Sequence, residues 1–249
     1  MRLKGKVALV TGSSRGIGRA IALAFAKEGA DLVINYIRST GKAAEVISEI
    51  KSLGRNAIAV KADASNINEV RDMFEKCIQE YGKLDILVNN AADFSVMDFS
   101  LKKPDWKGWQ RMVDVNVKGI LICSHVASKH MLEQKSGNII NIVADWAGGG
   151  LCYILMKSAG IPLTKGLARA LAPFIRVNAI QPGSIDTGWI SALPEEDKEK
   201  LKESILLKRW GQPEDVAKVA VFLASEETSF ITGTVIVVDG GESINPWAP

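Results

Sequence analysis

The sequence has little of several features that mark specialised classes of protein. Its 249 residues include three cysteines, Cys77, Cys123 and Cys152, and their wide spacing indicates neither a zinc site nor a disulfide framework. The 31 basic and 28 acidic residues leave a net charge of +3, too small a surplus to indicate binding to nucleic acid or a membrane surface. No apolar run is long enough to cross a bilayer or to form a signal peptide. We therefore expect a cytoplasmic protein in a reducing compartment, with neither nucleic acid nor membrane as a partner.

The composition is otherwise ordinary for a globular protein. Hydrophobic residues make up 47% of the chain and charged residues 24%, with 22 glycines and 8 prolines, which excludes a disordered or collagen-like chain. A length of 249 residues fits one α/β domain. Because no repeat, low-complexity tract or linker interrupts the sequence, we expect a single domain over 1–249.

Short runs rich in valine and isoleucine alternate with longer helix-compatible segments along the whole chain. Most of these runs are apolar without alternation, as strands buried on both faces should be. Gly29, Gly54 and Gly82 each follow a helix-like stretch, where a glycine in the left-handed conformation ends a helix. The pattern predicts a parallel sheet with helices on both faces. The expected strands are 7–10, 32–36, 57–61, 84–89, 138–143, 176–180 and 235–238.

A glycine-rich segment follows the first expected strand and precedes an alanine-rich helical stretch at 19–28. In that position, glycines let the backbone turn tightly and approach a diphosphate, while the first amides of the helix favour the anion. The segment therefore predicts a dinucleotide-binding turn, although a plain loop would also use glycines. It reads Thr11-Gly12-Ser13-Ser14-Arg15-Gly16-Ile17-Gly18.

The Gly-x-x-x-Gly-x-Gly spacing of this turn resembles the classical short-chain dehydrogenase/reductase family. The resemblance covers almost the whole chain, and the C-terminal region looks most like the 3-oxoacyl-(acyl-carrier-protein) reductases. It implies a doubly wound, seven-stranded Rossmann-type sheet with strand order 3-2-1-4-5-6-7, and an assembly that is commonly a homotetramer. The further matching segments are Asn89-Asn90-Ala91-Ala92, Asn116, Tyr153-x-x-x-Lys157, Pro182-Gly183 and Val238-Asp239-Gly240-Gly241.

The same resemblance implies where a nicotinamide cofactor is bound. Asp63 is the family's contact to the adenine, while the start of the following helix is better capped by Ser65 or Asn66. A turn after the sixth strand holds the nicotinamide carboxamide. Tyr153 and Lys157 are also implied as cofactor contacts. The contacts implied in the turn and after the fourth strand are Gly12, Ser14, Arg15, Gly16, Ile17, Gly18, Asn90 and Ala91, and those after the sixth strand are Pro182, Gly183, Ile185 and Thr187.

The end of the second strand predicts NADP(H) as the cofactor. An NAD-preferring site places a carboxylate there for the ribose 2′-hydroxyl, but this strand ends Asn35-Tyr36-Ile37-Arg38-Ser39-Thr40. The nearest acid, Asp31, lies at the other end of the strand. Arg15 and Arg38 can both reach a 2′-phosphate, with Tyr36 and Ser39 beside them. The alternative is that both arginines are ordinary solvated surface residues.

Tyr153 and Lys157 are the candidate catalytic pair, supported by Asn116. Carbonyl reduction by hydride transfer needs a proton donor, and a free tyrosine with a pKa of about 10 is a poor one at neutral pH. Four residues apart, the two side chains share a helix face, so we expect the ammonium to lower the tyrosine pKa. In the family, the asparagine completes a proton relay; Asn116 also suits a bend in a long helix.

The catalytic serine that the family places after the fifth strand is missing. Its position falls on Ala144, no Ser or Thr lies between Gly137 and Lys157, and the segment up to Tyr153 is shorter than in the family. Losing one donor to the substrate oxygen typically costs about 10²–10³ in rate. Three interpretations remain: a slow reductase, a substitute donor such as Trp146 or a protonated Asp145, or a protein that binds NADPH without turnover.

The substrate is expected to be a small carbonyl compound or alcohol, with an acyl thioester as one form. The segment 188–210 is the expected mobile lid over the substrate. Its apolar residues suit an apolar or extended substrate, but they can equally pack the lid on the body or face another subunit. Lys208 and Arg209 could meet an acidic carrier, although a dibasic pair is more often solvated surface.

Two further pairs lie on expected helices. His125 and His130 are five apart, so they do not share a helix face, and we expect no metal site. Trp106 and Trp109 are three apart and are expected to pack on one side of a helix at a subunit or core contact, with a functional stacking role as the alternative.

Overall fold

The computed structural model describes residues 1–96, 102–145 and 150–245. Its centre is one parallel sheet with the strand order β3-β2-β1-β4-β5-β6-β7, which confirms the predicted topology. The strands are β1 (Val7–Val10), β2 (Asp31–Tyr36), β3 (Ala57–Lys61), β4 (Ile86–Asn89), β5 (Gly137–Ile142), β6 (Ile175–Pro182) and β7 (Val235–Val238). The chain runs outward in opposite directions on either side of the β1 and β4 pair. The loops that leave these two strands therefore diverge and open the crevice where ligands bind in such sheets.

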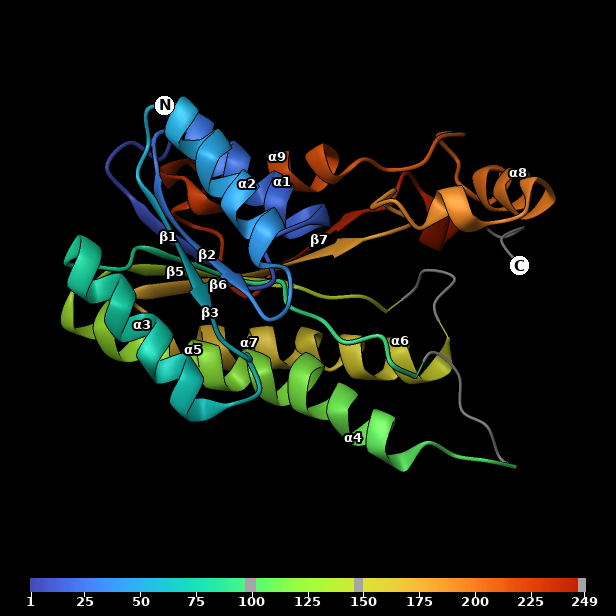
Figure 1. Cartoon of the computed structure of the whole chain (residues 1–249), viewed down its shortest axis with the longest axis horizontal. Coiled ribbons are helices and arrows are strands. Elements are labelled where there is room, and N and C mark those ends of the chain that lie inside the picture. The colour runs from blue at the N-terminus through green and yellow to red at the C-terminus, as the bar shows by residue number, and fades with distance from the viewer. Residues whose placement is uncertain (97–101, 146–149, 246–249) are drawn as a thin grey trace.

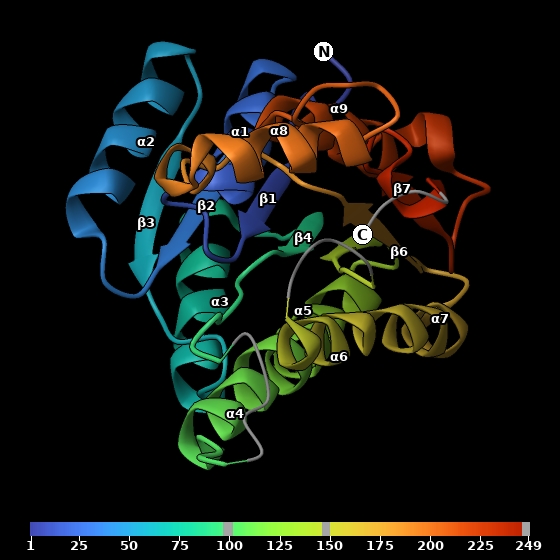
Figure 2. The same cartoon turned by 90° about the vertical axis from the view of Figure 1, so that its right-hand side faces the viewer.

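Helices cover both faces of the sheet (Figure 1). One face carries α1 (Gly16–Lys27), α2 (Thr40–Ser52) and α9 (Pro213–Ala224), and the other carries α3 (Ile67–Tyr81), α5 (Gly119–Glu133) and α7 (Gly160–Leu171). The helix α4 (Trp106–Val113) leads into α5 through a π-helical turn, η1 (Asp114–Lys118), and α6 (Leu151–Ser158) leads into α7. Figure 2, which faces the right-hand end of Figure 1, shows α6 and α8 (Glu195–Ser204) at the same end of the sheet.

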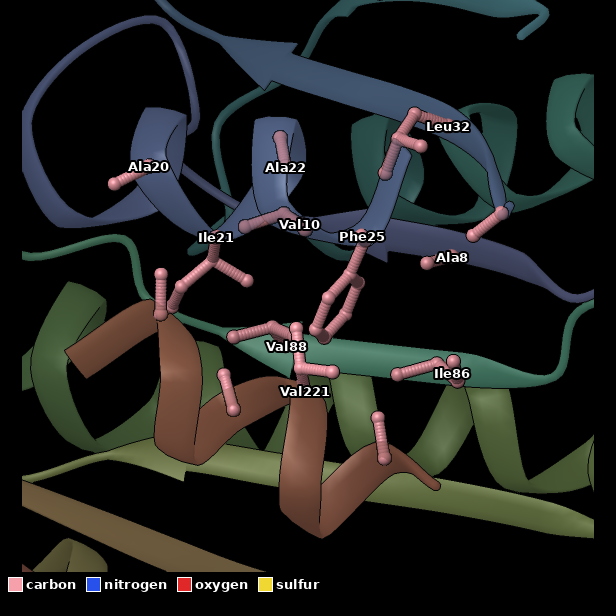
Figure 3. Close-up of a cluster of buried hydrophobic side chains, with 14 of the residues drawn as sticks. Ala8, Val10, Ala20, Ile21, Ala22, Phe25, Leu32, Ile86, Val88 and Val221 are labelled. Carbon is pink, nitrogen blue, oxygen red and sulfur yellow. The ribbon is translucent and has the colours of Figure 1, made fainter. Parts of the chain in front are cut away.

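The core between α1, α9 and the sheet is built from apolar side chains that the helical period of α1 brings to one face. Ile21 and Phe25 of α1 are fully buried, and Figure 3 shows them directed towards Val88 of β4 and Val221 of α9. Burying a side chain such as Phe25 contributes about 2–3 kcal/mol. The start of α1, which carries the glycine turn, is thus held firmly against the sheet.

The helix ends and capping residues agree with the sequence in detail. Gly29, Gly54 and Gly82 have φ of 95°, 72° and 73°, the left-handed conformation expected after a helix. Of the two candidate caps for α3, the structure uses Asn66, whose side chain accepts hydrogen bonds from Asn68 N at 3.0 Å and Glu69 N at 3.4 Å. No helix in the described part of the chain is both long and apolar enough to cross a membrane.

Two strand boundaries differ from the prediction by two residues, and every other boundary agrees to within one residue. The fourth strand begins at Ile86 and not at residue 84, because Leu84 exchanges hydrogen bonds with the side chain of Gln134 instead of a strand, at 3.1 Å and 2.9 Å. The sixth strand extends to Pro182, which lies opposite Val238 of β7. Proline lacks the amide hydrogen that strand residues donate. The last residue of a strand does not need this donor, so β6 can end at Pro182.

Candidate active site

The glycine turn joins β1 to α1 in a conformation that leaves helix amides free for an anion. Gly12 and Gly16 have φ of 63° and 56°, which favours glycine at both positions. Arg15 precedes the first turn of α1 in extended conformation, its side chain makes no capping hydrogen bond, and that turn contains no acidic residue. A helix start that is neither capped by a side chain nor next to an acid can bind a diphosphate.

A polar network brings the second motif against this turn. Asn90 donates from Nδ2 to the carbonyls of Thr11 at 2.9 Å and Gly12 at 3.2 Å. Thr11 Oγ1 accepts from the backbone amides of Asn90 at 2.9 Å and Ala91 at 3.0 Å. A Cβ atom at Gly18 would lie 2.5 Å from Asn90 Nδ2, so only a glycine lets α1 come this close. The predicted residues Gly12, Gly18, Asn90 and Ala91 therefore pack against one another.

Asn35 was not among the predicted site residues, although it shapes the turn. Its Oδ1 accepts from Gly12 N at 3.0 Å, and its Nδ2 donates to the Ala62 carbonyl at 2.9 Å. The side chain is 2% exposed and thus links the ends of β1, β2 and β3. The available signal was a polar residue near the end of an otherwise apolar strand.

The end of β2 carries the two arginines expected at the 2′ position. Arg15 and Arg38 are exposed and form no ion pair with any residue that the structure describes, whereas Tyr36 and Ser39 are half-buried. Asp31 lies at the opposite end of β2 and is paired with Arg55 at 2.7 Å. The end of the strand is therefore positively charged and lacks a competing acid.

Asp63 lies at the predicted adenine end and is held in a local network. Its carboxylate accepts from Ser65 N at 2.9 Å and pairs with Arg111 of α4 at 2.8 Å. Burial raises its pKa, but the hydrogen bonds from Arg111 and Ser65 outweigh burial, so the pKa is lowered overall. Asp63 is consequently an ionised carboxylate at neutral pH.

The helix α6 presents Tyr153 and Lys157 near the end of β5. Lys157 is 3% exposed, and its Nζ donates to the carbonyl of Ile142, the last residue of β5. Tyr153 is half-buried and stacks on Phe94, with ring centroids 4.9 Å apart and planes at 28°. The pair predicted from the sequence thus lies where β5 and the loop after β4 leave the sheet.

Asn116 lies at the centre of the π-helical turn η1, so the long helix is irregular where an asparagine suggested a bend. The residue is fully buried. Its Oδ1 accepts from Asp93 N and its Nδ2 donates to the Asp93 carbonyl, both at 2.9 Å. Asn116 thereby fixes the loop that carries Phe94 over Tyr153.

Burial shifts the two candidate catalytic groups in opposite directions. It raises the pKa of Tyr153 to about 12 and lowers the pKa of Lys157 to about 8. The sequence predicts a lowered tyrosine pKa, but in the protein alone burial outweighs any effect of the ammonium. The phenol therefore carries its proton at neutral pH, as a proton donor in carbonyl reduction must.

Lys157→Met is expected to raise the free energy of unfolding at about pH 7 by about 2–3 kcal/mol, because it removes a buried charge. The lysine pKa is 10.5 when exposed and about 8 in the fold. Below both values each state is protonated, and the folded state carries the penalty. Between them only the unfolded state binds the proton, so wild-type stability rises with pH and the difference from the variant narrows. Urea unfolding of both proteins from pH 7 to about pH 10 measures this; a variant less stable at every pH contradicts it.

The region of the missing serine has no hydroxyl side chain in the part that the structure describes. Ala144 is 6% exposed and lies two residues after β5. Asp145 is exposed, and its Oδ1 accepts a hydrogen bond from Gln181 Nε2 at the end of β6. Trp146, the other proposed substitute donor, lies outside the described residues.

The turn after β6 approaches the glycine turn. A Cβ atom on Gly16 would lie 3.2 Å from Thr187 Cγ2. Glu242, which the sequence did not indicate, is 2% exposed and accepts from Ser184 N at 2.8 Å and Ser184 Oγ at 2.7 Å. The buried carboxylate of Glu242 thus holds the segment that contains Pro182, Gly183, Ile185 and Thr187.

The expected lid contains the short 3₁₀ turn η2 (Ile190–Ala192) and α8. Two of its apolar residues, Ile190 and Ile205, are buried, as expected of residues that pack the lid on the body. Trp189 and Leu207 are 43% and 66% exposed, as expected of residues that meet a substrate or another subunit. The dibasic pair has local partners. Arg209 pairs with Asp215 at 2.7 Å and Lys208 Nζ donates to the Glu203 carbonyl at 2.6 Å. Trp106 and Trp109 pack edge to face with centroids 6.4 Å apart, but Trp106 is 60% exposed and therefore does not lie at a core contact.

Comparisons with known proteins agree with the fold. A family model described as Enoyl-(Acyl carrier protein) reductase matches residues 12–243. The 3-oxoacyl-(acyl-carrier-protein) reductase FabG of Staphylococcus aureus is 42% identical over 241 residues, covering 95% of this chain and 97% of the relative. The 3-oxoacyl-(acyl-carrier-protein) reductase of Synechocystis is 41% identical over 245 residues, covering 96% of this chain and 97% of the relative.

Solved structures show the same relationship. A short-chain dehydrogenase/reductase from Serratia marcescens superimposes with a TM-score of 0.90 at 36% identity, covering 98% of this chain and 100% of that chain. A short chain dehydrogenase from Burkholderia cenocepacia in complex with NADP gives a TM-score of 0.89 at 36% identity with the same coverage. By sequence, strand order and the arrangement of its motifs, this chain belongs to the short-chain dehydrogenase/reductase family.

Proposed function

We propose that this protein is an NADP(H)-dependent oxidoreductase that interconverts a ketone and a secondary alcohol, with a 3-oxoacyl thioester as the favoured substrate class. The observation that carries the proposal is the position of Tyr153 and Lys157, which share α6 beside the end of β5. Relatives named as 3-oxoacyl-(acyl-carrier-protein) reductases support the substrate class. A structural relative in complex with NADP supports the cofactor.

The residues of the crevice fit a nicotinamide dinucleotide, which supplies or accepts a hydride when bound. The start of α1 and the glycines would hold its diphosphate, and Arg15 and Arg38, with Tyr36 and Ser39, would hold the 2′-phosphate. Asp63 would meet the adenine. The remaining contacts proposed are Gly12, Ser14, Gly16, Ile17, Gly18, Asn90, Ala91, Pro182, Gly183, Ile185 and Thr187.

In this proposal Tyr153 protonates the carbonyl oxygen during reduction and accepts the proton in the reverse direction. The ammonium of Lys157 stabilises the phenolate that remains, and burial makes this electrostatic effect stronger than it is in water. Asn116 supports the relay from its irregular turn beside α6, where it also fixes Asp93. The apolar lid residues that remain exposed suit an extended acyl chain.

One alternative function is favoured by a specific observation. Ala144 supplies no donor for the substrate oxygen, and burial raises the pKa of Tyr153. A protein of this kind would bind NADPH without catalysing reduction.

Assaying the purified protein with NADPH and a panel of ketones that includes 3-oxoacyl thioesters separates the two functions. We expect consumption of NADPH that depends on the ketone, measured by the absorbance of the reduced nicotinamide. A parallel fluorescence titration measures NADPH binding without turnover. Binding without any ketone-dependent oxidation would favour the alternative function.

We also propose a homotetramer in the cytoplasm, as expected from the family. Support comes from exposed apolar residues on the elements that the family uses for assembly: Leu121 on α5 is 42% exposed and Val237 on β7 is 47% exposed. Sedimentation of the purified protein gives the subunit count.

A further inference from the structure

Gln181 places a buried carboxamide in contact with Asp145, the residue that follows the position of the missing hydroxyl. It lies near the end of β6, opposite Val237 of β7, and follows Ile180, which pairs with Ile142 of β5. The parallel register therefore sets Gln181 next to Val143, one residue before Ala144. Its side chain is 5% exposed, which is unusual for a glutamine and indicates a fixed position.

The side chain of Gln181 lies on the same face of the sheet as the candidate catalytic pair. Residues two apart on a strand point to one face, so Gln181 shares a face with Ala179 and with its partner Asn141. Asn141 donates to Thr164 of α7 at 2.9 Å, which identifies that face as the one covered by α7. Lys157 meets the Ile142 carbonyl at the same end of β5.

The carboxamide is oriented by a charged acceptor. Gln181 Nε2 donates one N–H to Asp145 Oδ1, and hydrogen bonds to a carboxylate are stronger than those to neutral acceptors. This contact fixes the nitrogen, and not the oxygen, of the amide on the side of the loop after β5. An amide nitrogen carries two hydrogens, and Gln181 Nε2 makes no second hydrogen bond to the described residues.

We propose that the second N–H of Gln181 donates a hydrogen bond to the oxygen of the substrate, in place of the hydroxyl that Ala144 lacks. Asp145 is the positioning residue that orients the amide. The inference rests on the proposed function, because it supplies the donor which that reaction otherwise lacks. It replaces one candidate of the sequence analysis, the protonated Asp145, by a group that needs no proton uptake to act as a donor.

The decisive variant is Gln181→Met, which keeps nearly the same volume and removes the donor. We expect kcat for the ketone to fall about 10²-fold, the cost of one donor to a developing oxyanion, while the Kd for NADPH stays unchanged. The matched control is Gln79→Met on the exposed face of α3, which should keep wild-type kcat. Asp145→Asn should lower kcat less than Gln181→Met and leave KM nearly unchanged.

Rescue separates a donor from a merely structural role. Adding Ala144→Ser to Gln181→Met should restore kcat at least about tenfold, whereas the same serine in the wild-type background should gain less, because the two donors serve one oxygen. If Gln181→Met does not fold, Gln181→Asn withdraws the amide by one methylene and makes the same test. A variant with wild-type kcat overturns the inference.

Failure of the inference is distinguishable from failure of the proposed function. Turnover that depends on Tyr153 but not on Gln181 overturns only the inference. Turnover by Ala144→Ser alone, with an inactive wild type, also overturns it, because Gln181 then does not replace the hydroxyl. No turnover by either protein, with NADPH still bound, overturns the proposed function and the inference together.

Discussion

Replacing Tyr153 with phenylalanine is expected to lower kcat for ketone reduction about 10²–10⁴-fold, the usual contribution of a positioned proton donor. The substitution removes one oxygen atom and keeps the ring that stacks on Phe94 at 4.9 Å. The Kd for NADPH, measured by fluorescence titration, should change little. Steady-state kinetics with the best ketone of the panel provides the measurement.

Tyr81→Phe is the matched control for this experiment. The Tyr81 hydroxyl donates to the Leu32 carbonyl at 3.3 Å, and burial raises its pKa as it does for Tyr153. It lies at the end of α3, away from α6. Its loss should therefore leave kcat unchanged. Equal kcat for Tyr153→Phe and wild type would show that the phenol is not the proton donor.

The double variant Arg15→Ala, Arg38→Asp is expected to weaken NADPH binding about 10²–10³-fold and to leave NADH binding nearly unchanged. Each arginine would contribute a charge-assisted hydrogen bond to the 2′-phosphate, worth about 1.5–3 kcal/mol, and the new carboxylate would repel that phosphate. The same carboxylate can accept from the 2′-hydroxyl of NADH. Fluorescence titration with both cofactors provides the ratio.

Arg19→Ala serves as the control for the loss of a positive charge near the turn. Arg19 lies on α1 and already pairs with Glu49 of α2 at 2.6 Å, so it is not available to a phosphate. It should leave the preference between the cofactors unchanged. If the double variant loses affinity for NADPH and NADH equally, the two arginines do not read the 2′-phosphate.

The sheet could be predicted from the sequence because its strands are buried on both faces. Such strands are continuous apolar runs, and glycines such as Gly29 and Gly82 separate them from the helices. The errors arose where a side chain or a neighbouring strand decides the boundary. Leu84 bonds to the side chain of Gln134 and therefore lies outside β4, and pairing with β7 extends β6 to Pro182. Neither partner is near in sequence.

The candidate site was predictable where its residues lie close together in the sequence. Tyr153, Lys157 and the glycines form local motifs, so their spacing alone indicates them. Asn35 and Gln181 contact residues that only strand pairing brings near. The sequence shows each of them as a single polar residue in an apolar run, and this pattern does not indicate which residue it contacts. The direction of the Tyr153 pKa also needed the fold, because burial cannot be read from four-residue spacing.

The close approach at Gly18 divides the cofactor crevice into two regions with different tolerance for redesign. A single added methyl group there would meet Asn90 and the Gly12 carbonyl, so this position in the diphosphate half of the crevice accepts no larger residue. Arg38 stands at the other half in open solvent. A variant library aimed at changing the coenzyme should therefore randomise the end of β2 and keep every glycine of the turn as it is.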